Sequence, residues 1–162
     1  MGRAFKIAKG GGVGQLPPLQ MAKKAEERAT RGQLDLFDDV PLSLPSLTRA
    51  QKIQKRATRI GFDWPTIDGV LEKVSDELSE LERARSAQDS EAVIEEYGDL
   101  LFTMVSLARH LGINSEQSLR LATQKFESRI SQVIRFAESQ GIDLTIATDN
   151  EKNGLWDQAK SV

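Results

Sequence analysis

The stretch EEYGDLLFTMVSLARHLG, residues 95–112, decides how the rest of the sequence is interpreted. Three acidic residues near its start, Glu95, Glu96 and Asp99, lead directly into a segment that would be apolar on nearly every side of a helix. Such a helix is typically central in a helical protein. A carboxylate at the edge of a core is costly unless a positive charge meets it. The stretch therefore raises the question of which cation these acids face.

Hydrophobic residues recur with the 3.6-residue period of an α-helix on both sides of this stretch. Helices are expected over residues 47–61, about 67–85, 89 or 90 to 112, and 114–141. Asn114 and Gln117 resemble a capping box at the start of the last of these helices. No convincing strand is found, and short connections favour antiparallel neighbours. The sequence therefore predicts an all-α protein built as an antiparallel helical bundle.

The same period predicts which side chains face the core. On the second expected helix these are Ile67, Val70, Leu71, Val74, Leu78 and Leu81, and on the fourth they are Leu119, Ala122, Phe126, Ile130, Val133 and Ala137. Gly61, Gly112 and Gly141 are expected to end their helices. One nearly all-apolar helix among four leaves more apolar surface than a chain of this size covers easily, which favours a homodimer.

Composition limits the classes of function. The chain has 162 residues, a net charge of −2 and a pI near 5.5, which argue against a broad electrostatic contact with a nucleic acid polymer. It has no cysteine, so a metal site would use oxygen ligands and favour a hard cation. No apolar run approaches the roughly 20 residues of a membrane span, and the start lacks the apolar block of a signal peptide. We expect a cytoplasmic protein without a membrane partner.

The first part of the chain differs in composition from the rest. Residues 1–42 combine Gly- and Pro-rich stretches with a charged run and contain Pro41, which excludes a helix through it. We expect this segment to be a tail and connector, partly disordered or of artificial origin. The folded helical domain is expected over residues 43–162.

Acidic pairs recur at helical spacing on two of the expected helices. Glu77 and Glu80 share one flank of the second helix with Lys73, and Glu96 and Asp99 are three residues apart on the third. Four carboxylates converging in a bundle would bind one or two divalent cations. The alternative is an ordinary solvated helix face, because chance alone gives about three or four such acidic pairs in a chain this acidic. The position of Asp99 beside the apolar helix favours the metal site.

Basic and aromatic residues suggest a second element of a site. Lys125 and Arg129 are four residues apart on one flank of the fourth helix, where they could grip phosphate oxygens or pair with surface acids such as Glu127. Trp156 lies in a polar segment that we interpret as a tail, and it could stack on a base. His110 lies in the last turn of its helix, where we interpret it as a cap.

From about residue 40 to residue 160 the chain resembles the MazG family of nucleoside triphosphate pyrophosphohydrolases, especially the C-terminal MazG domain of the full-length bacterial protein. The motifs that carry the resemblance are LTRAQKIQKRA, GFDW, KVSDELSE, EEYGDLLFTMVSLARHLG and QKFESRI, in the family's order. The family signature, E-E-x-x-E followed by E-x-x-D, appears here as Asp76-Glu77-x-x-Glu80 and Glu96-x-x-Asp99. Asp76 departs from the common glutamate.

The resemblance implies a function and a set of site residues. Glu77, Glu80, Glu96 and Asp99 would be both the catalytic carboxylates and the ligands of Mg²⁺, for which Mn²⁺ can substitute. Nucleotide-binding positions would be Lys73, Lys125, Arg129 and Trp156. The implied reaction is hydrolysis of nucleoside triphosphates between the α and β phosphates by a homodimeric all-α bundle. The alternative is a catalytically inert helical interaction module, which magnesium-dependent release of pyrophosphate would distinguish.

Overall fold

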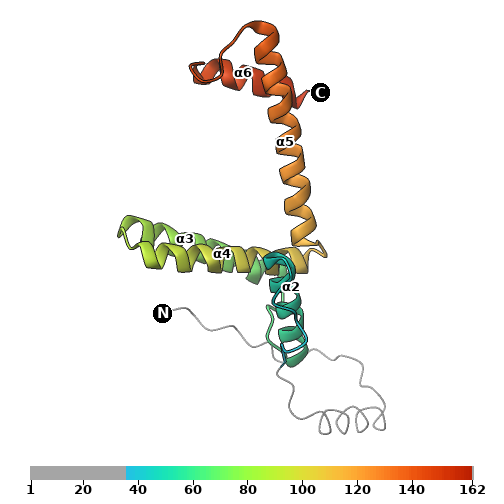
Figure 1. Ribbon diagram of the computed structural model, residues 1–162. Coiled ribbons are helices and arrows are strands. Elements are labelled where there is room, and N and C mark those ends of the chain that lie inside the picture. The colour runs from blue at the N-terminus through green and yellow to red at the C-terminus, as the bar shows by residue number, and fades with distance from the viewer. Residues whose placement is uncertain (1–35, 162) are drawn as a thin grey trace. The chain divides into compact units, whose positions relative to one another are not determined.

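The structure, a computed structural model, describes residues 36–161. In this range the elements are α2 (Ser46–Ala57), the 3₁₀-helix η1 (Thr58–Ile60), α3 (Ile67–Ser86), α4 (Ser90–His110), α5 (Ser115–Gln140) and α6 (Asp149–Lys160), and no strand occurs between residues 36 and 161 (Figure 1). The predicted all-α class is confirmed for these residues. Most of the predicted tail, residues 1–35, lies outside the described range, and the domain boundary near residue 43 stays a prediction.

The chain divides between Ser115 and Glu116 into two compact units. In the first unit, α3 and α4 lie side by side as an antiparallel hairpin, and α2 packs against α4 (Figure 1). Both hairpin helices begin with a capping side chain, as the Thr66 hydroxyl accepts a hydrogen bond from the Gly69 amide and the Asp89 carboxylate accepts one from the Ala92 amide. The predicted N-terminus of α4 is therefore confirmed.

Two glutamine side chains attach α2 to the rest of the first unit. Gln54 is buried and donates from Nε2 to the Phe102 carbonyl at 2.7 Å. Gln51 donates to the Ile113 carbonyl at 2.8 Å and accepts from the Ser115 amide at 3.2 Å. The α-helix ends at Ala57, earlier than predicted, because the last turn tightens into η1 before Gly61, which has a φ of 87°.

The α3 helix buries a narrow seam. Its buried residues are Val70, Glu77 and Ala84, spaced seven residues apart, which is the spacing of a helix packed along one partner. Leu71 and Leu78 are 47% and 57% exposed, so the prediction that they face inward is wrong for this structure. The reason is that α4 covers one seam of α3 and leaves the neighbouring stripe open.

The second unit is built from α5 and α6. Val133 and Ala137 of α5 pack against Leu155 and Ala159 of α6. The predicted inward positions Val133 and Ala137 are therefore confirmed. The prediction is wrong for Leu119, Ala122 and Phe126, which are exposed because the core of this unit forms only along the C-terminal part of α5. As predicted, α5 ends before Gly141, whose φ is 67°.

The α6 helix corrects the interpretation of residues 153–160, the segment around Trp156, as a polar tail. Its start is fixed by a capping box in which the Glu151 amide donates to the Thr148 hydroxyl and the Thr148 amide donates to the Glu151 carboxylate. The spacing of Leu155 and Ala159 then supplies one apolar face. Among the described helices, none combines the length and apolar character of a membrane span.

Candidate functional site

The acidic pair of α3 occupies the seam of the hairpin. Glu77 lies between Val70 and Ala84 on the buried face, and its side chain is only 4% exposed. Because α4 covers this face, the carboxylate of Glu77 is held against α4. Glu80, three residues later, lies at the edge of the seam with a side chain that is 28% exposed.

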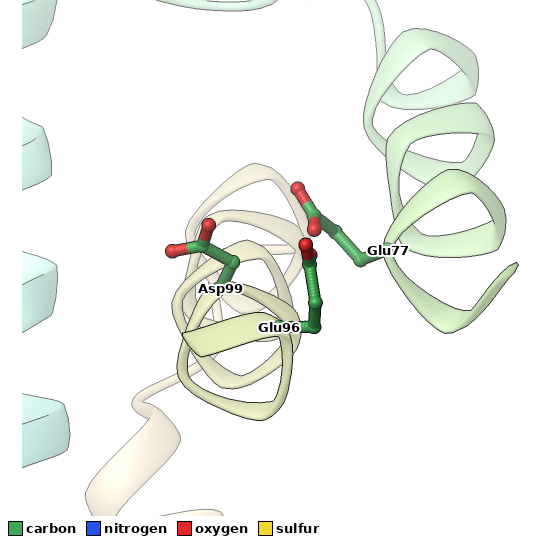
Figure 2. A group of neighbouring side chains, drawn as sticks. All are labelled: Glu77, Glu96 and Asp99. Atoms are coloured by element: carbon green, nitrogen blue, oxygen red, sulfur yellow. The ribbon is translucent and has the colours of Figure 1, made fainter. Parts of the chain in front are cut away.

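Three carboxylates from the two helices come together here. One oxygen each of Glu77, Glu96 and Asp99 lies within 4.8 Å of the others. Figure 2 shows Glu77 reaching from α3 toward Glu96 and Asp99, which project from α4. The structure thus brings together three of the four acids predicted from the sequence, while Glu80 lies outside this three-residue group. Below, the carboxylate cluster means Glu77, Glu96 and Asp99.

Among the described residues of the first unit, Lys73 is the basic residue that forms an ion pair with this cluster. Its Nζ lies 2.5 Å from Glu77 Oε1 and 3.8 Å from Glu80 Oε2, and Glu80 also lies 3.7 Å from the Arg83 guanidinium. Burial lowers the pKa of Lys73, but the hydrogen bond that Lys73 donates to Glu77 and the charges of Glu77, Glu80 and Asp76 outweigh it, so the pKa is raised above its ordinary value. Lys73 therefore stays cationic at neutral pH.

Apart from the contact with Lys73, the negative charge of the carboxylate cluster is poorly compensated. Burial, followed by the charges of Glu80, Glu77, Asp99 and Glu95, raises the pKa of Glu96 above its ordinary value. The second oxygen of Glu77, Oε2, is buried without a hydrogen-bond partner. An unpaired buried acceptor on a charged group is destabilising. Oxygen ligands with excess negative charge are what hard divalent cations bind, so these residues fit such an ion.

The other predicted residues lie in the second unit. The Trp156 ring is packed against two residues of α5: its centroid is 5.9 Å from that of Phe126, and the Arg129 guanidinium carbon lies 5.7 Å from it. Lys125 is exposed one turn before Arg129. Trp156 thus joins α6 to α5 in addition to any contact with a ligand.

A polar network that was not predicted from the sequence lies at the other end of α4. Asp63 Oδ2 accepts from Arg109 Nη1 at 2.7 Å, and Asp63 Oδ1 lies 3.1 Å from His110 Nε2. Burial raises the pKa of Asp63, but Arg109 and His110 lower it by more. The pKa of Asp63 is therefore below its ordinary value. His110 is in the last turn of α4, as predicted, although it faces this carboxylate.

A cavity of about 370 Å³ adjoins this network. Its lining includes Gln54, Phe62, Trp64, Phe102 and Ser106. The GFDW motif contributes three of the residues involved, Phe62, Asp63 and Trp64, but the motif alone does not indicate which residues they pair with.

The described residues thus form an all-α protein. Its two packed helices α3 and α4 carry a candidate site for a divalent cation, in which one buried carboxylate oxygen has no hydrogen-bond partner. Comparison with known proteins then shows which domain this part of the chain resembles. Residues 66–134 match the MazG nucleotide pyrophosphohydrolase domain. This stretch of the chain is therefore a MazG domain, which confirms the resemblance.

Two of the relatives described here are named as nucleoside triphosphate pyrophosphohydrolases. It is 44% identical over 139 residues to the nucleoside triphosphate pyrophosphohydrolase of Escherichia coli K12, covering 85% of this chain and 53% of that protein. It is 36% identical over 137 residues to the nucleoside triphosphate pyrophosphohydrolase/pyrophosphatase MazG of Thermotoga maritima, covering 85% and 52%. It is also 36% identical over 139 residues to the uncharacterized protein YabN of Bacillus subtilis, covering 85% and 28%. The chain thus spans about half the length of the first two.

Proposed function

We propose that this chain hydrolyses nucleoside triphosphates, ribonucleotides or deoxyribonucleotides or both, to nucleoside monophosphate and pyrophosphate in a Mg²⁺-dependent reaction. The observation that carries the proposal is the carboxylate cluster, in which Glu77 Oε2 is buried and has no partner. The cluster lies within the stretch that matches the MazG domain. The names of the relatives support the same reaction class.

The bond that breaks joins the α phosphorus to the oxygen that bridges to the β phosphate. Water supplies the oxygen that the α phosphorus gains, and the leaving pyrophosphate keeps the bridging oxygen. Mg²⁺, or Mn²⁺ in its place, neutralises phosphate charge and lowers the pKa of a bound water when it is present. Glu77, Glu80, Glu96 and Asp99 would hold the ion, and Glu77 or Glu80 would orient the attacking water.

Basic residues would stabilise the charge that develops on the leaving group. In the proposal, Lys125 and Arg129 contact phosphate oxygens, and Trp156 contacts the base. Lys73 belongs to the same nucleotide-binding set. The pairing of Arg129 with the ring of Trp156 supports a common role for these two residues, because the contact holds the two half-buried side chains as neighbours in the second unit. Lys125, one turn away from Arg129 and exposed, is accessible to phosphate.

A homodimer is the second part of the proposal. Large apolar side chains are exposed along both helices of the hairpin: Leu71, Leu78, Ile94, Tyr97, Leu101 and Met104. A set of this kind exceeds the scattered apolar residues that are normal on a monomer surface. A second copy of the chain would cover such a stripe in a symmetric dimer. Sedimentation of wild type and of a Leu78→Lys variant would test this, with a dimer expected for the wild type alone.

The test of the activity is pyrophosphate release from a panel of ribo- and deoxyribonucleoside triphosphates, with and without Mg²⁺. The proposal expects release of equal amounts of monophosphate and pyrophosphate that depends on the metal and is abolished by chelation. An inert helical module would release neither product with any nucleotide. Inorganic phosphate as the product would show that a different bond is broken and would contradict the proposed reaction.

A further inference from the structure

Lys73 and Glu77 form a partly buried ion pair one helical turn apart on α3. The lysine side chain is 22% exposed and that of the glutamate 4%, and Nζ lies 2.5 Å from Oε1. Solvent screens such a pair less than it screens a pair on the surface. Since a buried carboxylate without a partner strongly destabilises the folded state, Lys73 compensates part of the negative charge of the cluster.

The two oxygens of Glu77 are in different situations. Oε1 contacts Lys73, whereas Oε2 is buried and has no partner. Among the described residues of the first unit, no basic side chain forms an ion pair with Glu96 or Asp99. The compensation that Lys73 provides is therefore one-sided, and it acts through Glu77 and, more weakly by distance, through Glu80.

We propose that Lys73 is the internal counter-ion of the carboxylate cluster, holding Glu77 through Oε1 in the cation-free protein and opposing the divalent cation electrostatically when it binds. The inference rests on the proposed function for the presence of that cation. It makes Lys73 a positioning residue that acts before any nucleotide arrives. The family resemblance, by contrast, implies only that Lys73 contacts the nucleotide.

The charge of Lys73 determines whether this residue strengthens or weakens cation binding. An ammonium near the cluster stabilises the folded protein while the cluster is empty, but it repels a divalent cation that enters the same partly buried site. Because the two effects are thermodynamically linked, a group that stabilises the empty state more than the loaded state must weaken cation binding. Neutralising Lys73 should thus destabilise the empty protein and tighten the binding of the cation.

The experiment is a titration of the nucleotide-free full chain with Mn²⁺. Binding is measured during the titration by calorimetry or by the electron paramagnetic resonance of the free ion. The informative variants are Lys73→Gln, which removes the charge and keeps an N–H donor, and Lys73→Arg, which keeps the charge. Lys73→Gln is expected to bind Mn²⁺ on the order of tenfold more tightly, to melt at a lower temperature without metal, and to gain more in Tm from the metal. Lys73→Arg is expected to stay near the wild type.

Arg85→Gln is the matched control. Arg85 pairs with Glu82 on the same helix, but both side chains are largely exposed, so its removal should change neither the Mn²⁺ affinity nor the metal-induced rise in Tm. If Lys73→Gln lowered Tm without changing the Mn²⁺ affinity, the pair would be a simple structural ion pair and the proposal would be overturned. Weaker nucleotide binding with unchanged Mn²⁺ affinity would overturn it as well, in favour of direct phosphate contact.

A wild-type measurement covers the case in which neutral variants do not fold. With ¹³C-labelled lysine, the side-chain signal of Lys73, assigned by its loss in Lys73→Arg, should move when Mg²⁺ is added without nucleotide. An unmoved signal at saturating Mg²⁺, or a wild type that binds no metal, would overturn the counter-ion role. Pyrophosphate release by the wild type is measured separately, so an active protein with an unresponsive Lys73 refutes this inference and leaves the proposed function standing.

Discussion

The guanidinium carbon of Arg129 lies 5.7 Å from the centre of the Trp156 ring, and this contact joins the two helices of the second unit. An arginine at this distance from an indole face makes a cation–π interaction. Phe126 packs against the same ring at a tilt of 51°. Trp156 is therefore part of the packing between α5 and α6, and any test of its role in binding has to separate the two effects.

Trp156→Ala is predicted to raise KM with little change in kcat. Base stacking would be similar in the ground state and the transition state, and a loss of ~1–3 kcal/mol corresponds to roughly 5- to 150-fold. Steady-state kinetics with one good substrate provides the measurement. Trp156→Phe is the control, because it keeps an aromatic face against α5. A change confined to kcat would argue against contact with the base.

Lys125→Ala is predicted to lower kcat as well as the affinity for substrate. A lysine that faces the leaving pyrophosphate meets more charge as the bond to the α phosphorus breaks, so its contribution grows in the transition state. The matched control is Lys152→Ala, an exposed lysine of α6 in the same unit. Unchanged kcat and KM in Lys125→Ala would exclude the residue from the phosphate-binding set.

The boundaries of α3 were predictable from its apolar period, and those of α4 from its period, its capping residue and Gly112. The same periodicity placed Leu71 and Leu78 inside, and the structure exposes them. Periodicity identifies an apolar stripe, but it does not say how many neighbours cover it. In this hairpin the covered seam runs through Val70, Glu77 and Ala84, so a glutamate is buried where a leucine one position away is not.

The candidate site was likewise predictable only in part: its acidic residues were predicted, and the Asp63 network was not. The spacing of Glu77 and Glu80 on one helix, and of Glu96 and Asp99 on the next, is a local property of each helix. The family motif indicated that the two pairs belong to one site. The network of Asp63 with Arg109 and His110 joins residues 46 and 47 positions apart, and no local pattern indicates such a pairing. The α6 helix was missed for a different reason: its capping box, from Thr148 to Glu151, was present in the sequence, but its surroundings are polar.

The Asp63 network predicts a specific dependence of stability on pH. The pKa of Asp63 is lowered in the folded state, so its contribution is present above the ordinary aspartate pKa and is lost as the pH falls through the lowered value. Asp63→Asn should lower Tm at neutral pH, and the difference from the wild type should shrink in acid. Thermal melts between pH 7 and pH 3 provide the measurement.

Arg109→Met tests whether the ion pair between Asp63 and Arg109 causes this dependence of stability on pH. If the Asp63 contribution depends on Arg109, the double variant should be little less stable than either single variant at pH 7. Additive losses, or a difference between Asp63→Asn and the wild type that stays constant with pH, would show that the effect comes from packing instead of charge.

The last prediction concerns the carboxylate cluster as a unit. Glu96→Gln and Asp99→Asn are each expected to remove nearly all turnover, because each takes one charged oxygen ligand from a site in which three carboxylates lie within 4.8 Å. Helical content should stay unchanged. Mg²⁺ should raise the Tm of the wild type by mass action on the folded state and raise that of either variant much less. Circular dichroism, thermal melts and pyrophosphate release on the same preparations provide the three measurements. Wild-type turnover in either variant, or a metal-induced rise in Tm equal to that of the wild type, would refute the assignment of these residues to the metal.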